Sequence, residues 1–396
     1  MENFDYLIIG GGIIGLSVAH VLRERFLQKS ICIIEKEVEV AMHASGRNSG
    51  VLHAGFYYSS DSLKAKLTVS GNRIMKEFCA KNDIKMNNCG KVVVAKNEKE
   101  LPSIYELIER GKRNGVELKL IDKKELFEID PNIETCEKAI FSPTTTSINP
   151  ADYCMKLKKT LLDKEVIFKH QTTFQGAKDN VAITSKGSFK YGYLVNCAGL
   201  YADVVAKKFG VGKNFTILPF RGSYFKYSGD HNDLKLSVYP VPDLRNPFLG
   251  VHFTKTVDEQ IKIGPSAMPA LWREQYGLFE NFKLSEMVTI AIQNLKMLYL
   301  NPDGYRMMAW NEIRKLKKST MIDEAMLMVK KLGREFHVMR PGIRAQLLDM
   351  EKHKLVMDFE IQHGENSIHV LNAVSPAFTC SFTIAAHIVN EMAKNS

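Results

Sequence analysis

Three glycines near the N-terminus constrain the fold of this chain more than any other feature. Gly10, Gly12 and Gly15 follow a short run of β-forming residues, and a segment with a helical apolar period comes directly after them. A second apolar run then ends in Glu35, 20 residues after the last of the three glycines. This spacing, between a strand and a helix and with an acid after the next strand, predicts a dinucleotide-binding β-α-β unit.

Each part of this motif has a physical reason. The first glycine permits a tight turn, the second lets the backbone approach a pyrophosphate, and the third lets helix and strand pack closely. The helix N-terminus, which includes Ile13 and Ile14, offers free N–H groups and the positive end of its dipole to phosphates. Glu35 is expected to accept hydrogen bonds from a ribose and to disfavour a 2′-phosphate. A glycine-rich turn without a ligand is the plainer alternative.

The chain is long enough for two domains. It has 396 residues, of which 45% are apolar, and this supports a sizeable core. The two ends read as one α/β, Rossmann-like FAD/NAD(P)-binding domain, and the strand-rich middle reads as an inserted mixed-sheet (α+β) substrate domain. We expect the first domain to comprise residues 1–80, 145–215 and 335–396, and the second to comprise residues 81–144 and 216–334.

Charge and cysteine content narrow the function classes. A formal net charge of +10 suits nucleic acid, an anionic membrane surface or an acidic small substrate, but no nucleic-acid-binding motif accompanies it. The seven cysteines have no C-x-x-C spacing, which indicates reduced thiols, and no metal site is predicted. No apolar run is long enough to span a membrane. We therefore expect a cytoplasmic protein, with peripheral contact to the cytoplasmic membrane as an option.

Two apolar stripes with helical spacing lie late in the chain, at 284–299 and 322–329. The plainer interpretation is that both belong to packing helices. The alternative is a basic amphipathic surface that docks on a membrane, because the basic run Arg314 to Lys318 lies close by.

The segment SGRNSGVLHAGFYY, residues 45–58, is too glycine-rich for a helix interior and too polar for a core strand. It belongs to a set of motifs that together resemble one family. The others include IIGGGIIGLS (8–17), NCGKVVVA (88–95), PFRGSYF (219–225), YPVPD (239–243), PFLGVHFT (247–254), PGIRAQ (341–346) and LNAVSPAFTCS (371–381). The chain resembles FAD-dependent oxidoreductases of the D-amino-acid-oxidase-like superfamily, and more closely the L-2-hydroxyglutarate dehydrogenase/oxidase family. It departs from that family at Phe378, where a small residue is usual, and in GPSA (264–267), where GPNA is common.

The resemblance implies FAD as cofactor and a segment at 45–58 that crosses the flavin. Ser375, Pro376 and Ala377 would precede the last helix, which is expected from about Thr379 with its N-terminus aimed at the pyrimidine edge of the flavin, and Pro376 would suit the first helical turn. Arg47 would balance diphosphate charge. An ordinary surface arginine is the alternative for Arg47. The full set of implied cofactor contacts is Gly10, Gly12, Ile13, Ile14, Gly15, Glu35, Lys36, Ser45, Arg47, Asn48, Ser49, Gly50, Val51, Thr172, Asn196, Ala198, Gly199, Gly342, Arg344, Ser375, Pro376 and Ala377.

The implied reaction is oxidation of the dicarboxylate (S)-2-hydroxyglutarate to 2-oxoglutarate, with hydride transfer to flavin N5. The hydroxyl proton needs a base, and a neutral imidazole suits that role. His53 is the first candidate and His252 is its rival; a structural histidine is the alternative for each. Arg221 and Arg344 are expected to hold the carboxylates.

Further donors to the substrate are Tyr57, Tyr58, Lys64 and Tyr239. A salt bridge at a strand edge is the alternative for Arg221, and a solvated side chain is the alternative for Lys64.

Several alternatives stay open on sequence alone. A flavin enzyme of the same fold could act on an amine, an amino acid or glycerol 3-phosphate, because fold does not decide substrate. A flavoprotein that binds nucleic acid and a nicotinamide-dependent dehydrogenase are more distant options. The electron acceptor is expected to be quinone or O2. Oligomeric state and covalent attachment of FAD, for which His43 and His53 are near enough in sequence, are not fixed by the sequence.

Overall fold

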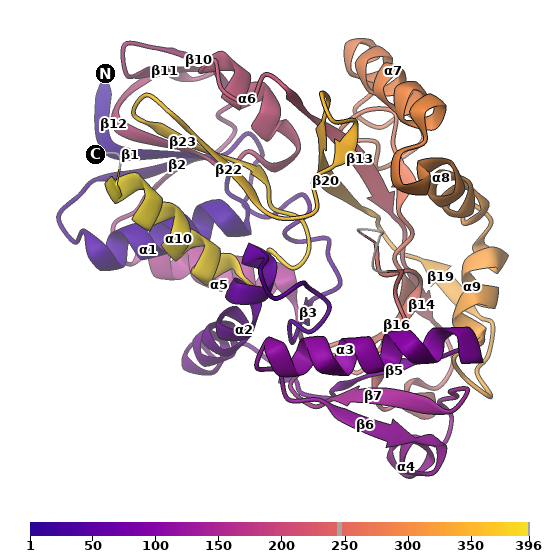
Figure 1. Cartoon of the computed structure of the whole chain (residues 1–396). Helices are drawn as coiled ribbons and strands as arrows, with labels where there is room; N and C mark the ends of the chain where they lie inside the picture. Colours follow the sequence, from indigo (N-terminus) through magenta and orange to yellow (C-terminus); the bar gives the residue numbers. More distant parts are fainter. Residues whose placement is uncertain (244–247, 395–396) are drawn as a thin grey trace. The chain divides into compact units, whose positions relative to one another are not determined.

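The computed structural model describes residues 1–243 and 248–394, and the chain divides into two compact units (Figure 1). The first unit comprises Met1–Asn48, Pro150–Pro219 and Arg344–Ser396, and the second comprises Ser49–Asn149 and Phe220–Ile343. Pro247, the first residue of the PFLGVHFT motif, lies outside the described residues.

The bounds of the two units differ from the predicted domains mainly at residues 49–80, which were predicted to lie in the cofactor domain. In the structure β3 (Val51–Leu52) pairs with β8 (Thr146–Ile148) inside the second unit. Asn72 on α2 (Leu63–Lys81) also donates to the carbonyl oxygen atoms of Leu52 and His53, both at 3.1 Å. These contacts tie residues 49–80 to the second unit.

The first unit is built on a mixed sheet around β1 (Glu2–Ile9), which pairs in parallel with β2 (Ile31–Ile34) and β12 (Gly187–Asn196). The strand order is β10-β11-β12-β1-β2-β9, and β23 pairs with both β12 and β22. The remaining strands are β9 (Ile167–Lys169), β10 (Phe174–Lys178), β11 (Val181–Thr184), β22 (Glu360–Gly364) and β23 (Ser367–Asn372). The Rossmann-like α/β fold that the glycine motif predicted is therefore confirmed.

Helices cover this sheet. In Figure 1, α1 (Ile13–Arg25), α5 (Pro150–Leu162) and α10 (Ser381–Lys394) lie together along the sheet. The short α6 (Ala202–Lys208) adds Val205 to a cluster formed by strand residues such as Leu7 and Leu194. The α1 backbone begins immediately after the glycine turn, which places its N-terminus at the carboxyl end of β1.

The second unit contains an eight-stranded sheet with the order β19-β14-β17-β16-β15-β5-β7-β6. Its strands are β5 (Lys91–Val94), β6 (Lys119–Asp122), β7 (Lys138–Ser142), β14 (Phe225–Tyr227), β15 (Ser237–Pro240), β16 (His252–Lys255), β17 (Ile261–Gly264) and β19 (Phe336–Val338). A small sheet joins β3 and β4 (Met86–Asn87) to β8. Two strands carry the chain between units: β13 (Phe215–Gly222), paired with β18 (Met268–Pro269) in the second unit, and β20 (Gly342–Asp349), paired with β21 (Lys354–Leu355) in the first.

The two faces of the eight-stranded sheet differ in chemistry, because side chains alternate along each strand. One face, which we call the apolar face, carries Val92, Val238, Phe253 and Ile263 and is covered by α9 (Lys318–Met326), with α4 (Lys123–Ile129) beside it. The opposite face, which we call the polar face, carries Lys91, Tyr239, His252 and Thr254, all of them buried. Helix α3 (Leu101–Arg113) packs Ile104 and Leu107 into the cluster that contains Tyr239 and Val93 on this face.

Of the two predicted apolar stripes, one is buried in the structure and the other is exposed. The stripe on α9 is buried, as its packing interpretation predicts, through Ile322, Ala325 and Val329 just after the helix. The stripe on α7 (Leu284–Leu300) is exposed, with Leu295 at 64% and Tyr299 at 81% exposure. The packing interpretation is therefore wrong for the α7 stripe, because this helix buries a different side, which includes Ile290 and Met297.

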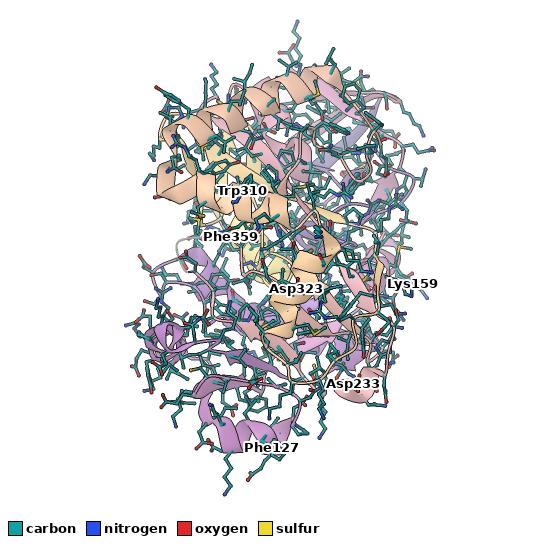
Figure 2. The ribbon with its side chains drawn as sticks, turned by 90° about the vertical axis from the view of Figure 1, so that its right-hand side faces the viewer. Phe127, Lys159, Asp233, Trp310, Asp323 and Phe359 are labelled. Atoms are coloured by element: carbon teal, nitrogen blue, oxygen red, sulfur yellow. The ribbon has the colours of Figure 1, made fainter. Side chains whose placement is uncertain are left out.

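Helix α8 (Tyr305–Arg314) continues this exposed surface, and its Trp310, labelled in Figure 2, is 61% exposed. None of the helices in the described part of the chain is both long and apolar enough to cross a membrane.

Candidate cofactor and substrate sites

In the first unit, three strands end at one edge of the sheet. The N–H group of Gly10, after β1, donates to the carbonyl of Ile34 at 2.8 Å, and the N–H group of Cys197, after β12, donates to the carbonyl of Ile9 at 2.9 Å. The residues that follow these strands are therefore neighbours, although they are far apart in sequence. The carboxyl edge of a parallel sheet is where open α/β folds bind their ligands.

The turn at this edge can be made only with glycine at two positions. Gly10 has φ +107°, and an added Cβ there would lie 2.5 Å from the carbonyl oxygen of Cys197. An added Cβ at Gly15 would lie 2.0 Å from the carbonyl oxygen of Gly10. Both contacts are with backbone atoms, which cannot move aside as a side chain can. The glycine spacing thus reflects the close packing of the turn, the helix and the neighbouring strand.

The N-terminus of α1 is open for an anion at part of its first turn. Ile13 donates its N–H to Ser45 Oγ at 2.9 Å, so one of the free donors is already used. Among the described residues, no acceptor is found for the backbone N–H groups of Gly12 and Ile14. Two aligned donors at the positive end of a helix dipole fit a pyrophosphate group. Gly12 leaves the approach clear, since an added Cβ would come within 3.0 Å of Ser45 Oγ.

Glu35 is fixed at the same edge, at the end of β2. Its Oε2 accepts from the N–H of Gly11 at 2.6 Å, and its Oε1 accepts from the N–H of Glu37 at 2.9 Å. Thr172 donates its N–H to the carbonyl of Glu35 at 2.8 Å. An ionised carboxylate has lone pairs left after two such bonds, so Glu35 can still accept from a ribose hydroxyl. Thr172 lies next to Glu35, and its contact with the cofactor stays a prediction.

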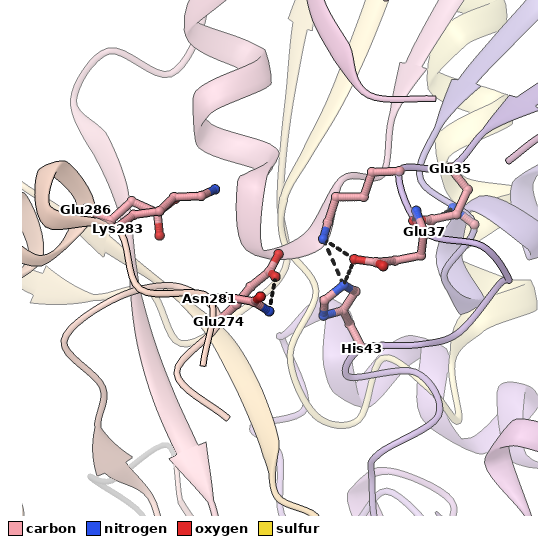
Figure 3. Close-up of polar contacts among 9 residues, drawn as sticks. Glu35, Glu37, His43, Glu274, Asn281, Lys283 and Glu286 are labelled. Carbon is pink, nitrogen blue, oxygen red and sulfur yellow. Dashed lines mark hydrogen bonds and ion pairs between the residues drawn. The ribbon is translucent and has the colours of Figure 1, made fainter. Parts of the chain in front are cut away.

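Lys36, the next predicted contact, is engaged by Glu37 and His43, which are labelled in Figure 3. Its Nζ lies 2.5 Å from Glu37 Oε1 and 3.0 Å from His43 Nε2, and His43 Nε2 lies 2.9 Å from the same Glu37 oxygen. Lys36 therefore has an acidic partner inside the chain. His43, considered from sequence as a possible attachment point for FAD, belongs to the same cluster.

The predicted contact of Asn196 with the cofactor is not supported. Asn196 is 0% exposed, and its amide donates to the carbonyl of Ala202 at 2.8 Å and lies 3.1 Å from His369 Nδ1. Its Oδ1 accepts from the N–H of Ala198 at 3.1 Å. Asn196 therefore shapes the turn after β12, while Ala198 and Gly199 remain at its surface.

Other predicted contacts of the first unit lie in its loops. The amide of Asn48 donates to the carbonyl of Ser45 at 2.8 Å and so holds the start of the 45–58 segment. Arg47 is half-buried, and Arg344 lies half-buried on β20. Ser49, Gly50, Val51 and Gly342 fall in the second unit.

The sequence predicts a turn at residues 375–378 and a helix from about Thr379, which the structure matches within two residues, but the prediction that Pro376 lies in the first helical turn is wrong. Helix α10 begins at Ser381, and the preceding residues form turns in which Ala377 donates its N–H to the carbonyl of Val374 at 3.0 Å. Pro376 and Ala377 are buried, whereas Ser375 is exposed. Phe378, the departure from the family pattern, packs its ring against Tyr153 with centroids 5.7 Å apart. A backbone turn thus separates β23 from the N-terminus of α10.

In the second unit, His53 lies directly after β3 and is almost completely buried. Burial and the nearby charge of Lys91 lower the pKa of His53 to about 3. The imidazole is therefore neutral at physiological pH, which is the form that accepts a proton.

His252 and Tyr239 form a stacked pair on the polar face. Their ring centroids lie 3.8 Å apart with an interplanar angle of 16°. His252 Nδ1 lies 2.9 Å from the carbonyl oxygen of Gly250. Because a carbonyl can only accept, Nδ1 carries the proton, and Nε2 is the basic nitrogen of the neutral ring. Burial raises the pKa of the Tyr239 hydroxyl, so that it stays protonated.

The remaining predicted substrate residues of the second unit lie on or just before α2 and on β13. Lys64, in the first turn of α2, is buried, with its Nζ 6.0 Å from the ring centroid of the half-buried Tyr58. The solvated alternative for Lys64 is therefore excluded. Arg221 on β13 is half-buried, its Nε has no hydrogen-bond partner in the described part of the chain, and burial lowers its pKa.

Lys91 is the residue that the sequence analysis missed. It is 0% exposed, and its Nζ lies 4.7, 4.6 and 4.7 Å from the ring centroids of Phe56, Tyr57 and Tyr239. The available signal was the alternation of the predicted strand KVVVA, which places Lys91 on the same side as Val93. Without the pairing of β5 to β15, nothing in the sequence distinguishes it from a lysine at a strand end.

Comparison with known proteins gives a consistent picture. Residues 5–391 match the family model described as FAD dependent oxidoreductase. The chain is 35% identical over 404 residues to L-2-hydroxyglutarate dehydrogenase of Escherichia coli K12, which covers 98% of this chain and 93% of that protein. It is 34% identical to the human mitochondrial L-2-hydroxyglutarate dehydrogenase, with 99% and 89% covered.

The fold is also found among solved structures. L-alpha-glycerophosphate oxidase from Mycoplasma pneumoniae with FAD bound superposes with a TM-score of 0.77 at 20% identity, covering 99% of this chain and 95% of that chain. Glycine oxidase from Geobacillus kaustophilus gives a TM-score of 0.70 at 16% identity, with 100% and 96% covered. At these identities the likeness shows the fold, and the family match indicates FAD as the cofactor.

Proposed function

Because the chain belongs to the L-2-hydroxyglutarate dehydrogenase family of FAD-dependent oxidoreductases, we propose that it oxidises (S)-2-hydroxyglutarate to 2-oxoglutarate. The coarser function, FAD-dependent oxidation of a CH–OH group, follows from the family itself. The observation that carries the finer proposal is 34–35% identity to these dehydrogenases along 98–99% of the chain. The glycerophosphate and glycine oxidases share the fold at 20% identity or less, so they carry no argument for their own substrates.

The first unit would hold FAD at the carboxyl edge of its sheet. The N–H groups of Gly12 and Ile14 would bind the pyrophosphate, and Glu35 would accept from the ribose. Bound there, FAD supplies the two-electron acceptor that takes the hydride from C2 of the substrate. The protein's share of the reaction is to place the substrate and to remove the hydroxyl proton.

We propose that an imidazole of the second unit accepts this proton, either that of His53 or that of His252. Burial keeps His53 neutral, and the hydrogen bond to Gly250 leaves Nε2 of His252 as a basic nitrogen. The alcohol must lose its proton as the hydride leaves C2, and a positioned base at this step contributes typically 10²–10⁴-fold to the rate.

A dicarboxylate substrate also needs cationic or multi-donor partners. Arg221 is the first candidate in the second unit, because its planar guanidinium is only half-buried and its Nε is not used by any described residue. Lys64 and Tyr57 are the second candidates, since both are buried in the second unit, as His53 is. Arg344, in the first unit, stays a prediction from the sequence.

Anaerobic reduction of the bound flavin tests this function. The purified holoprotein should lose its flavin absorbance on addition of (S)-2-hydroxyglutarate, and the (R) enantiomer should act at least an order of magnitude more slowly. Glycine, sarcosine and glycerol 3-phosphate should leave the absorbance unchanged. Reduction by one of these three, with none by (S)-2-hydroxyglutarate, would remove the proposal.

We further propose that the reduced enzyme passes its electrons to a quinone in a membrane with anionic lipids. On α7 the exposed residues Leu284, Val288, Ile292, Leu295 and Tyr299 share one side of the helix, and Met307 and Trp310 are exposed on α8. In the basic run that begins at the end of α8, Arg314, Lys317 and Lys318 are exposed, whereas Lys315 is buried and pairs with Glu312. An apolar stripe beside basic residues suits the interface of an anionic bilayer.

Co-sedimentation with vesicles that contain about one-third phosphatidylserine tests this contact. Wild-type protein should bind, and Leu295→Glu should weaken binding about tenfold, because it puts a charge into the apolar stripe. Leu162→Glu is the matched control, since Leu162 is also exposed on a helix but lies on α5. Equal binding by all three proteins would contradict the assignment of this surface, and a rate with O2 as high as with quinone would contradict the acceptor.

A further inference from the structure

Lys91 occupies a position where an apolar side chain is expected. Along β5, Val92 and Val94 point into the apolar face, and Val93 points into the cluster on the opposite side. Lys91 alternates with Val92 and so shares the side of Val93. A lysine at a core-facing strand position is unusual, because burying a charge is costly unless it is paired.

Aromatic rings, and not a carboxylate, surround the ammonium group. Phe56, Tyr57 and Tyr239 each place a ring centroid within 4.7 Å of Nζ. Among the described residues, Nζ has no hydrogen-bond acceptor. Cation–π contacts recover part of the lost hydration, but burial still lowers the pKa of Lys91 to about 7. The site therefore contains a cation that lacks a negative partner.

This cation acts on one candidate base and shares a ring neighbour with the other. Its charge, together with burial, lowers the pKa of His53. Its ring neighbour Tyr239 stacks on His252. The titratable and charged groups around the cage are His53, Tyr57, Tyr58, Tyr239 and His252 from the polar side, Lys64 from α2 beside Tyr58, and Arg110 with Glu106 from α3. Glu106, the acid among them, pairs with Arg110 at 2.8 Å, so it is not the counter-charge of Lys91.

We propose that the caged ammonium of Lys91 is a positioning and charge-selecting residue: it supplies the buried positive charge that makes this site bind a dicarboxylate dianion in preference to a monocarboxylate. It acts through the tyrosine and histidine side chains around it rather than by contact, since it is completely buried. This inference rests on the proposed function and deepens it, because it explains how a dianion is chosen. At a separation of several ångströms inside a protein, one unit charge changes anion affinity about tenfold or more.

Proton uptake on ligand binding tests this in the wild-type holoprotein. The probe is glutarate, a dianion without the hydroxyl group that would be oxidised, and its binding is followed by perturbation of the flavin spectrum. A bound dianion stabilises the ammonium form of Lys91, so glutarate binding near pH 7 should take up about half a proton per site. Its affinity should also weaken as the pH rises from about 6 to about 9, while butyrate shows a much smaller dependence.

Two variants assign this effect to Lys91. Lys91→Met keeps the length of the side chain and removes its charge, so it should bind glutarate about tenfold more weakly at pH 7, with little loss for butyrate, and should lose the proton uptake. Lys255→Met is the matched control, because Lys255 is also buried in this sheet but donates to the carbonyl of His231. It should retain the uptake and the preference for glutarate. Proton uptake that persists in Lys91→Met, or none in the wild type, would overturn the inference.

The outcomes separate this inference from the proposed function. If (S)-2-hydroxyglutarate fails to reduce the flavin while glutarate still binds with proton uptake, the function is wrong and the role of Lys91 holds. If the flavin is reduced but glutarate binds without proton uptake, the function holds and the role of Lys91 is wrong. If the aromatic cage had only a structural role, Lys91→Met would lower the affinities for glutarate and butyrate equally. That result would also count against the inference.

Discussion

The carboxyl edge of the first unit and the polar face of the second unit prepare for their ligands in different ways. At the edge, backbone atoms shape the site. Gly10 and Gly15 leave room that a Cβ would fill, and N–H groups at the N-terminus of α1 are open. On the polar face, buried side chains shape the site, and the ring of Tyr239 contacts both Lys91 and His252. On our proposal, the cofactor would be bound mainly through backbone geometry, and the substrate through individual charges and rings.

The largest expected effect is loss of bound FAD when the carboxyl edge of the first unit is disturbed. Gly15→Ala places a Cβ 2.0 Å from the carbonyl oxygen of Gly10, which forces the turn apart. The purified variant should contain less than about a tenth of the wild-type flavin, or should not fold. Flavin absorbance per protein measures this.

Gly176→Ala is the matched control for the edge, because an added Cβ there meets no atom within 4 Å. It should keep its yellow colour and its thermal stability. If Gly15→Ala also binds FAD normally, backbone clearance is not what shapes the site.

The next largest effect is expected from loss of the catalytic base in the second unit. His53→Gln and His252→Gln should both keep FAD, because neither histidine belongs to the first unit. The variant that lacks the base should reduce its flavin about 10²–10⁴-fold more slowly with (S)-2-hydroxyglutarate. The other should mainly raise the substrate concentration needed for half-maximal rate. Rates within tenfold of the wild type for both variants would exclude both imidazoles as the base.

A smaller effect is expected on thermal stability. Lys91→Met should weaken the binding of a dianion but raise the melting temperature. Lys91 is protonated in the unfolded chain up to pH about 10, but burial lowers its folded pKa to about 7. Between these values the unfolded state binds more protons, so the wild type gains stability as the pH rises from 7 towards 10. Below pH 7 the full cost of the buried cation remains. Lys91→Met should therefore melt several degrees higher than the wild type at pH 6, and this advantage should shrink at pH 9.

Lys255→Met again provides the contrast, since it removes a donor to the carbonyl of His231 and leaves that oxygen without its partner. It should melt lower than the wild type at both pH values. A lower melting temperature for Lys91→Met at pH 6 would show that the aromatic cage stabilises the cation more than burial costs.

The same comparison explains what the sequence could predict. The glycine turn, Glu35 and the parallel strands were predictable, because backbone geometry demands particular residues at fixed spacing. Whether Asn196 contacts a ligand was not, because its partner His369 lies 173 residues away in sequence. Lys91 was missed for a related reason, since its cage unites three segments that only strand pairing brings together. The exposure of the α7 stripe could not be known either, because periodicity marks an apolar side but not what covers it.

The most direct test of the central claim is an anaerobic titration of the oxidised holoprotein with (S)-2-hydroxyglutarate, with both flavin absorbance and 2-oxoglutarate measured. The account predicts that one equivalent of substrate removes the flavin absorbance completely and yields one equivalent of 2-oxoglutarate. Full retention of the flavin absorbance, or its loss without 2-oxoglutarate, would contradict it.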